Sequence, residues 1–196
     1  MRHWIFHPLI FYPLVLLIAG LAIFASLEPQ NWPRKPAPVA GRHEGASLVW
    51  ERGGFNSPDV GPEQRLTVER DLWGQAQGMR IAQVPNQPPP TPAEQGVRIL
   101  FTPQDAALID GKAVTAEITY APLPFNSATS MALSVQGIGP AEWTTVAAPS
   151  PPEGPLKFEL PPQLAPDGLG IRVLAGQTGA EAFGLEIIKV KLTPHG

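Results

Sequence analysis

Histidines and paired carboxylates, which often carry out catalysis, do not occur in this sequence in an arrangement that a β domain would bring together into an active site. The four histidines all fall outside the segments that have a strand pattern; they are His3, His7, His43 and His195. A Ser-His-Asp triad or a histidine metal cluster inside the domain is therefore not expected. Glu69 and Asp71 are two residues apart, and paired carboxylates can hydrolyse glycosides, but with Arg70 between them we interpret the pair as a solvated strand face. We predict that the protein is not an enzyme and has no cofactor.

Oxygen ligands for a structural calcium ion are sparse. Asp110, Asp167 and Glu186 carry carboxylates of the kind that bind Ca²⁺, but no loop holds Asp or Asn residues in dense succession. The sequence predicts no metal site, and it leaves open a calcium ion bound by these three residues across the fold.

Aromatic residues are the candidates for ligand binding. A sugar ring stacks its apolar face on a flat side chain, while amides such as those of Asn126 and Gln136 bind its hydroxyl groups. The possible ligand platform consists of Trp143, Phe125 and Trp73. Trp143 follows the turn in "GIGPAEWTT" and is either such a platform or a plug at a sheet edge. Tyr120, Trp50 and Trp73 are expected in the core, and for Trp73 the ligand platform is the alternative.

Short segments with a period of two must position these residues. In "AVTAEITY", Val114, Ala116 and Ile118 alternate with polar residues, which predicts a half-buried strand. The other predicted strands are "SLVWE", "RLTVERDLW", "MRIAQV", "VRILF", "SMALSVQ", "LKFEL", "GIRVL" and "FGLEIIKVKL". In the last of these the apolar parity changes after Ile187, which predicts a β-bulge or a strand that crosses between sheets.

Proline marks the loops. The chain has 25 prolines, crowded at residues 85–92, 149–155 and 161–166, and proline cannot donate to a sheet ladder. Helix signals are few: "TPAE" at Thr91 and "TPQD" at Thr102 each offer a cap residue and a proline at the first helical position. Each predicts one helical turn at most.

These strands predict an all-β protein, a jelly-roll-like antiparallel β-sandwich preceded by one N-terminal transmembrane helix. An immunoglobulin-like sandwich is the alternative, which fits a domain of about 150 residues less well. The run from "GKAVTAEITYAPLP" through "MALSVQGIGPAEW" and "LKFELPP" to "GLGIRVLAG" and "FGLEIIKVKL" resembles the C-terminal strands of carbohydrate-binding-module or galactose-binding-like jelly rolls. The resemblance rests on strand rhythm, and it implies the fold more than the function.

A long apolar run precedes the strands. The residues from His3 to Leu27 include no Asp, Glu, Lys or Arg, and as a helix Trp4 to Leu27 would be about 36 Å long, enough for a hydrocarbon core of about 30 Å. The run is longer than the apolar core of a signal peptide, and its best cleavage site lies inside it. We predict a transmembrane anchor over residues 1–27, a Pro-rich spacer over 28–45 and a β-sandwich domain over 46–196.

The first half of the anchor is bulky, and its aromatic and proline residues either line the membrane interface or pack on a partner helix. These residues are Trp4, Phe6, Pro8, Phe11, Tyr12 and Pro13. The short head with Arg2 favours a signal-anchor with a cytoplasmic N-terminus, although Arg34, Lys35 and Arg42 count for the opposite orientation. The predicted location is the bacterial inner membrane, crossed once, with the C-terminal domain in the periplasm.

Composition limits the partners. The net charge is -3 and the basic residues are scattered, so nucleic acid is not expected to bind, and the absence of cysteine excludes disulfides and thiolate metal sites. We expect a non-enzymatic accessory subunit that uses its helix and its sandwich to bind and brace a larger inner-membrane protein complex, with the lipid bilayer as its other partner. The alternative is a membrane-tethered glycan-binding module for envelope polysaccharide.

Overall fold

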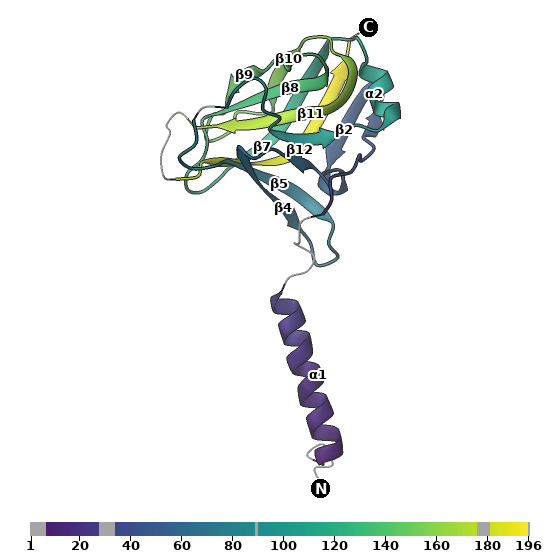
Figure 1. Cartoon of the computed structure of the whole chain (residues 1–196), viewed down its shortest axis with the longest axis vertical. Helices are drawn as coiled ribbons and strands as arrows, with labels where there is room; N and C mark the ends of the chain where they lie inside the picture. The colour runs from purple at the N-terminus through teal and green to yellow at the C-terminus, as the bar shows by residue number, and fades with distance from the viewer. Residues whose placement is uncertain (1–6, 28–33, 89, 176–180, 196) are drawn as a thin grey trace. The chain divides into compact units, whose positions relative to one another are not determined.

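The structure is a computed structural model that describes residues 7–27, 34–88, 90–175 and 181–195 (Figure 1). The chain divides into two compact units, Met1–Pro33 and Arg34–Gly196. Trp4 and Phe6, two of the predicted anchor contacts, lie outside the described residues.

The described element of the first unit is the helix α1, which spans Pro8–Ser26 and includes Pro13. It contains no charged residue, so none of its faces is charged. Pro8, Phe11, Tyr12 and Pro13, the other predicted anchor contacts, belong to it. Among the helices that the structure describes, none is both long enough and apolar enough to cross a membrane. The transmembrane assignment of residues 1–27 stays a prediction.

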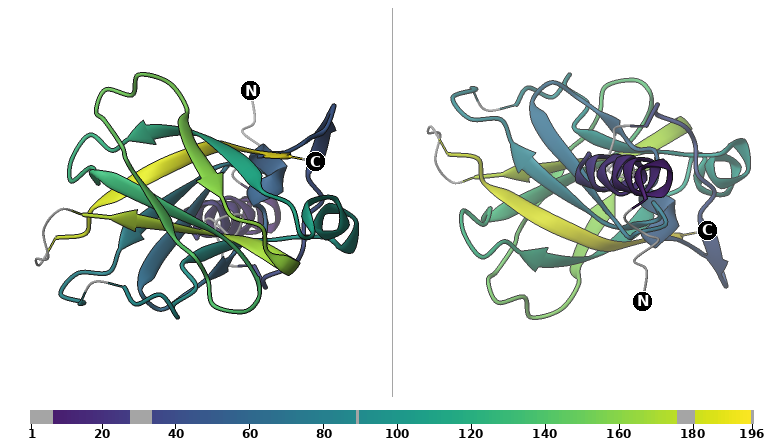
Figure 2. Two further views of the ribbon diagram at one scale, coloured as in Figure 1. Left: turned by 90° about the horizontal axis from the view of Figure 1, so that it is seen from above. Right: turned by 90° about the horizontal axis from the view of Figure 1, so that it is seen from below.

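The second unit is a sandwich of two antiparallel β-sheets, which confirms the predicted all-β sandwich (Figures 1 and 2). The larger sheet has seven strands: β1 (Arg42–Glu44), β2 (Ser47–Glu51), β4 (Gln64–Arg70), β5 (Ala76–Gln83), β7 (Val114–Pro122), β10 (Leu156–Leu160) and β12 (Gly184–Pro194). β12 is central, because β7 pairs along one of its edges while β5 and β2 share the other. β10, β4 and β1 lie beyond β7, β5 and β2 respectively.

The smaller sheet has five strands in the order β3-β6-β11-β8-β9. Their bounds are β3 (Asp59–Val60), β6 (Val97–Leu100), β8 (Ser130–Ile138), β9 (Thr144–Ala147) and β11 (Leu164–Leu174). From β5 onward, consecutive strands alternate between the two sheets, except that β8 and β9 form a hairpin within the smaller one. Every predicted strand segment contributes to a strand, whereas β1, β3 and β9 were not predicted.

The core lies between the sheets, where each strand contributes its apolar alternate positions. Tyr120 is 4% exposed and Trp50 is 1% exposed, which confirms both as core residues. The Trp50 ring packs 5.5 Å from the ring of Phe101. Complete burial of one such side chain contributes about 2 kcal/mol to folding, so the alternating pattern fixes which face of each strand points inward.

β12 contains the predicted irregularity. Its register against β7 shifts between Ile187 and Lys189, and Ile188 is left 40% exposed while Val190 and Leu192 are buried. The parity change is therefore a β-bulge. The partners of β12 all belong to the seven-stranded sheet, so the strand does not cross between sheets.

Two short helices accompany the sandwich. α2 (Pro103–Ile109) begins at its cap residue Thr102, whose side chain accepts a hydrogen bond from the backbone of Asp105, and it is longer than the single predicted turn. α2 and the C-terminus lie at the same end of the sandwich in all views (Figures 1 and 2). η3 (Arg52–Phe55) is a 3₁₀ helix after β2. The second predicted helical turn, at Thr91, is a β-turn in which the backbone N–H of Glu94 donates to the Thr91 carbonyl.

The segment before β1 is bound to the domain. The backbone N–H of Ala37 donates to the Ser57 carbonyl at 3.1 Å, and the Val39 carbonyl accepts from the Trp50 indole at 2.9 Å. The second unit thus begins at Arg34, which differs from the predicted spacer over 28–45. The reason is that backbone carbonyls in a proline-rich segment can still accept hydrogen bonds, although its proline nitrogens cannot donate them.

Candidate functional site

A groove of about 510 Å³ lies on the outer face of the five-stranded sheet, a volume within the range of small-molecule sites. Its floor is formed by β6, β8 and β11, and its rim by residues 92–95 and 137–141. The lining residues are Pro92, Ala93, Glu94, Gln95, Arg98, Gln136, Gly137, Gly139, Pro140, Ala141 and Asp167.

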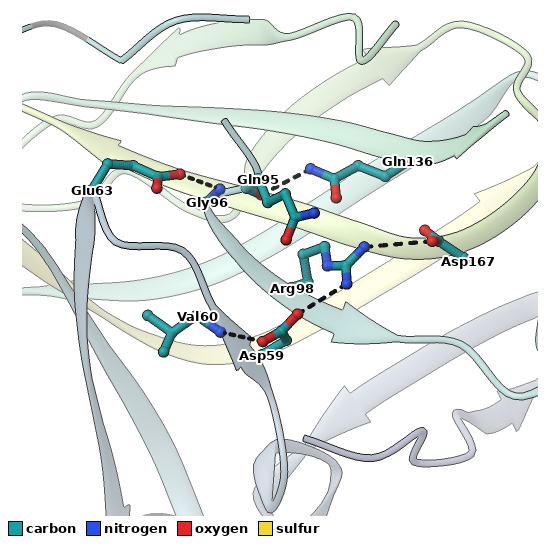
Figure 3. Close-up of polar contacts among 8 residues, drawn as sticks. All are labelled: Asp59, Val60, Glu63, Gln95, Gly96, Arg98, Gln136 and Asp167. Atoms are coloured by element: carbon teal, nitrogen blue, oxygen red, sulfur yellow. Dashed lines mark hydrogen bonds and ion pairs between the residues drawn. The ribbon is translucent and has the colours of Figure 1, made fainter. Parts of the chain in front are cut away.

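Arg98 is the cation of the groove floor (Figure 3). It occupies the outward position between the core residues Val97 and Ile99. Its guanidinium donates to Asp59 at 2.9 Å and to Asp167 at 3.4 Å, and only 16% of its side chain is exposed. Because two carboxylates neutralise this cation, the floor is not an anion site. The Asp167 side chain, 60% exposed, instead offers acceptor oxygens to N–H or O–H groups of a ligand.

Buried polar groups fix the rim to the sheet. The amide of Gln136 donates to the Gln95 carbonyl at 2.8 Å (Figure 3). The backbone N–H of Gly96 donates to the carboxylate of Glu63, and the Gly96 carbonyl accepts from the backbone of Gly61 at 2.8 Å. The segment before β6 is therefore held by the side chains of β8 and of the chain just before β4.

A second arginine supports the rim from below. Arg172 is 3% exposed, and its guanidinium donates to the carbonyls of Thr91, at 2.8 Å, and of Glu94. Burial lowers the pKa of Arg172, and the carboxylates of Glu63 and Glu94 oppose this shift. An arginine keeps its charge in proteins, so Arg172 is a buried cation that fixes the rim.

Trp143 completes this support. The Arg172 guanidinium lies 3.7 Å from the centroid of its ring, and the Trp143 indole donates to the Pro92 carbonyl at 3.3 Å. One face of the ring is thus occupied by Arg172, which is the geometry of a plug more than of a sugar platform. Gly170 makes the arrangement possible, because a Cβ there would lie 2.3 Å from the Gln136 amide and 2.8 Å from the Trp143 ring.

The three predicted platform residues are not brought together at the groove. Trp143 lies beside it, whereas Phe125, 85% exposed, lies on the connection from β7 to β8. Trp73, 88% exposed, lies in the turn between β4 and β5, so the prediction that it belongs to the core was wrong. Arg98 was missed by sequence reasoning, and the available signal was a charged residue in the middle of the apolar segment "VRILF".

The predicted calcium ligands have separate partners. Asp167 pairs with Arg98, and the Asp110 carboxylate accepts from the backbone of Ala165 at 2.8 Å. Glu186 lies on the other sheet beside Glu69. Within the described part of the chain, no group of three or more His, Asp or Glu side chains is placed to hold a metal ion.

One histidine joins a polar cluster at the surface. The Thr115 hydroxyl lies 2.5 Å from His195 Nε2 and 2.9 Å from one carboxylate oxygen of Glu159. In a catalytic triad the histidine stands between the hydroxyl and the acid, whereas here the hydroxyl stands between the other two. The order of contacts therefore does not provide an activated nucleophile.

The groove offers fixed hydrogen-bonding groups on a rigid floor and apolar proline and alanine side chains on its rim. No aromatic ring is among its lining residues. Comparisons of the chain with protein-family models, with characterised proteins and with solved structures found no match.

Proposed function

We propose that the protein is a non-enzymatic accessory subunit, anchored in the inner membrane by its N-terminal segment, whose β-sandwich faces the periplasm and binds and braces a larger membrane-protein complex. In this proposal the groove over β6, β8 and β11 takes an extended segment of that partner. The observation that carries the proposal is the lining of the groove, which combines polar groups in fixed positions with small apolar side chains.

An extended peptide matches this lining. Its backbone presents N–H and C=O groups along its length, and the groove supplies acceptor oxygens at Asp167 and Glu94, while Arg98 and Gln136 hold the floor and the rim in place by hydrogen bonds within the fold. Pro92 and Pro140 add apolar surface for the side chains of the peptide. Arginine is also enriched in protein interfaces.

The anchor is supported by composition. The uncharged run from His3 to Leu27 has no second described element in its unit against which to bury apolar side chains. A helix without a polar face is buried either in protein or in lipid. Both environments fit an accessory subunit, because the proposed anchor over residues 1–27 either spans the bilayer or packs on the partner within it.

The strand order supports a jelly roll as the finer description of the sandwich. β5, β12, β7 and β10 are neighbours in one sheet, and β6, β11, β8 and β9 are neighbours in the other. This is the order that results when eight consecutive strands wind in two Greek keys. Jelly rolls serve many functions, so the fold by itself does not favour either hypothesis.

Filling the groove tests the proposal. Ala93 is exposed on the groove rim, and Ala93→Trp places a large ring there without removing any hydrogen bond. Ala107→Trp, exposed on α2 and outside the lining, is the matched control. The full chain is expressed with a photo-crosslinking residue at position 140, gently solubilised after irradiation, and its products are identified by mass spectrometry.

We expect one discrete membrane-protein adduct that co-purifies with the full chain, persists in Ala107→Trp and is lost in Ala93→Trp. Recovery of the uncross-linked chain as a monomer in all three proteins would overturn the proposal. Adducts equally abundant in all three would exclude the groove as the contact.

Glycan binding is the second candidate. The exposed rings of Phe125 and Trp73 and the polar floor of the groove favour it, but these features lie in separate places. A glycan array probed with the full chain in mild detergent distinguishes the two. Binding that is lost in Ala93→Trp would favour the glycan module.

A further inference from the structure

The turn between β4 and β5 presents two large apolar side chains to the surroundings. Leu72 is 89% exposed and Trp73 is 88% exposed. Single exposed apolar residues are ordinary on protein surfaces, but a leucine and a tryptophan adjacent at one hairpin tip are a concentrated apolar contact.

This turn is held in one conformation. The Asp71 carboxylate accepts from the backbone N–H groups of Trp73 and Gln75, each at 2.9 Å, and from the Gln77 amide at 3.0 Å. Gly74 adopts φ +76°, which a glycine tolerates, and its N–H donates to the Asp71 carbonyl. The exposure of the two apolar residues is thus built into the turn.

Two guanidinium groups converge on the same turn. Arg34 donates to the Gly74 carbonyl at 2.7 Å, and Arg70 donates to the same oxygen at 3.2 Å. Arg70 is further held by Asn56, which is neutral, and no ion pair of the described residues includes Arg34 or Arg70. Lys35 adds a third, exposed positive charge, against the single negative charge of Asp71. Arg34 and Lys35 therefore add two exposed positive charges beside the turn, whose own carboxylate is that of Asp71.

The length of the covalent chain limits how far Arg34 can lie from Leu27. Only residues 28–33 separate Leu27 from Arg34, and seven residues of fully extended chain span at most about 25 Å. Because Arg34 binds the Gly74 carbonyl directly, the turn belongs to the part of the domain where the chain enters it.

We propose that the β4–β5 turn is a second membrane contact, in which Leu72 and Trp73 enter the headgroup region of the bilayer while Arg34 and Lys35 face anionic lipid phosphates. This inference rests on the proposed function only in taking the N-terminal segment as a membrane anchor. The contact fixes the height and the tilt of the sandwich over the membrane, which a bare anchor does not.

Lipid fits this turn better than a protein partner does. A tryptophan beside cations is the composition that concentrates at membrane interfaces. Two side chains on a single turn cover far less than the area of about 800 Å² per partner that a stable protein interface buries. The alternative is that a protein surface, from the partner complex or from a second copy of this chain, covers Leu72 and Trp73. The experiment must therefore be able to detect such a protein cover.

Cysteine labelling tests the contact in the full chain. The sequence contains no cysteine, so single substitutions carry one environment-sensitive fluorophore each. Leu72→Cys reports on the turn, Phe125→Cys is the matched exposed control on another connection, and Leu16→Cys reports on α1. Each labelled protein is reconstituted in phosphatidylcholine vesicles, with and without phosphatidylglycerol, that contain lipids with a quencher either high on the acyl chain, for positions 72 and 125, or near the end of the chain, for position 16 in the middle of the proposed span.

We expect the label at position 72 to be quenched several-fold more than the label at position 125, with the difference larger when phosphatidylglycerol is present. Trp73→Ser in the Leu72→Cys protein should reduce that quenching, because the stronger interfacial side chain is lost. Equal quenching at positions 72 and 125 would overturn the second contact. A label at 72 that is shielded both from these lipids and from aqueous iodide would overturn it in favour of a protein cover.

The label at position 16 separates this inference from the proposed function. Quenching at 16 without quenching at 72 keeps the anchor and overturns the second contact. Quenching at 72 without quenching at 16 supports the lipid contact and overturns the anchor. Absence of quenching at both positions overturns both.

Discussion

The guanidinium of Arg172 lies 3.7 Å from the centroid of the Trp143 ring, and both residues hold the segment that forms the groove rim. Arg172 donates to the Thr91 carbonyl, and Trp143 donates to the Pro92 carbonyl. A cation stacked on an indole and removed from water gains more than an exposed pair does. The pair thus links the rim segment to β11 and to the β8–β9 connection.

Trp143→Ala tests this link. Loss of the stacked ring and of its indole hydrogen bond should destabilise the protein by about 2 kcal/mol. Trp143→Phe keeps a ring face for Arg172 but loses the hydrogen bond to Pro92, so its cost should be about 1 kcal/mol. Urea unfolding of the full chain in mild detergent measures both. Equal costs for the two variants would show that the ring face contributes nothing.

Gly170→Ala tests how closely the outer face of β11 is packed. The new methyl group would meet the Gln136 amide and the Trp143 ring, and overpacking of this kind costs about 1–3 kcal/mol. Gly53→Ala is the matched control, because its nearest neighbours are side-chain ends of Gln75 and Asn56 at 3.3 Å or more, and it should stay within about 0.5 kcal/mol of the wild type. Unfolding midpoints that coincide for the two variants would contradict the close packing at Gly170.

The sandwich could be read from the sequence where burial imposes a period of two. β7 and β10 bury alternate residues, as the apolar pattern predicts. β1, β3 and β9 were not predicted because they are short. Pairing with neighbouring strands holds them in the sheets more than burial of their own apolar residues does. The burial of β1, for example, shows no alternation, since all three of its residues are exposed.

The groove could not be read from the sequence, because its charged groups meet only in the folded chain. Arg98 is 39 residues from Asp59 and 69 residues from Asp167. The outward position of Arg172 in a strand predicts solvent exposure, yet the rim segment covers it. The proline crowd at 85–92 indicates a loop but not the surface on which that loop lies.

Deletion of Ile188 tests the bulge in β12. Without this residue, Ile187, Val190 and Leu192 follow a strict alternation and keep the register that they already have against β7. We expect the variant to fold. Its free energy of unfolding should fall by about 1 kcal/mol, because the deletion alters the edge of β12 opposite β7, at the point where β5 ends and β2 begins.

Deletion of Lys191 is the matched control for Ile188. It moves Leu192, which is fully buried, to the outward face, and loss of that burial costs about 2 kcal/mol or more. Urea unfolding of both variants compares the two sites. If the Ile188 deletion were as damaging as the Lys191 deletion, the bulge would be needed for folding and not only accommodated.

Two carboxylates meet on the outer face of the seven-stranded sheet. Glu69 on β4 lies opposite Gly78, and the absence of a side chain there lets Glu186 of β12 approach from the other side. Burial raises the pKa of Glu186, and the charge of Glu69 and a hydrogen bond to it raise it further, while Arg80 opposes the shift. The folded protein therefore holds a proton at this site at pH values where the unfolded chain has released it.

Glu186→Gln tests the consequence for stability. Because the pKa of Glu186 is raised above about 4.5 in the folded state, this residue lowers stability as the pH rises through and above that value. The variant should match the wild type near pH 4 and exceed it at pH 7 by about 0.5 kcal/mol, the size of a cross-strand repulsion. Glu142→Gln, at an exposed carboxyl on the β8–β9 connection, is the matched control for the removal of one carboxylate. Urea unfolding of the full chain between pH 4 and 7 measures the difference, and a Glu186→Gln variant that is less stable than the wild type at pH 7 would show that Arg80, and not Glu69, dominates the site.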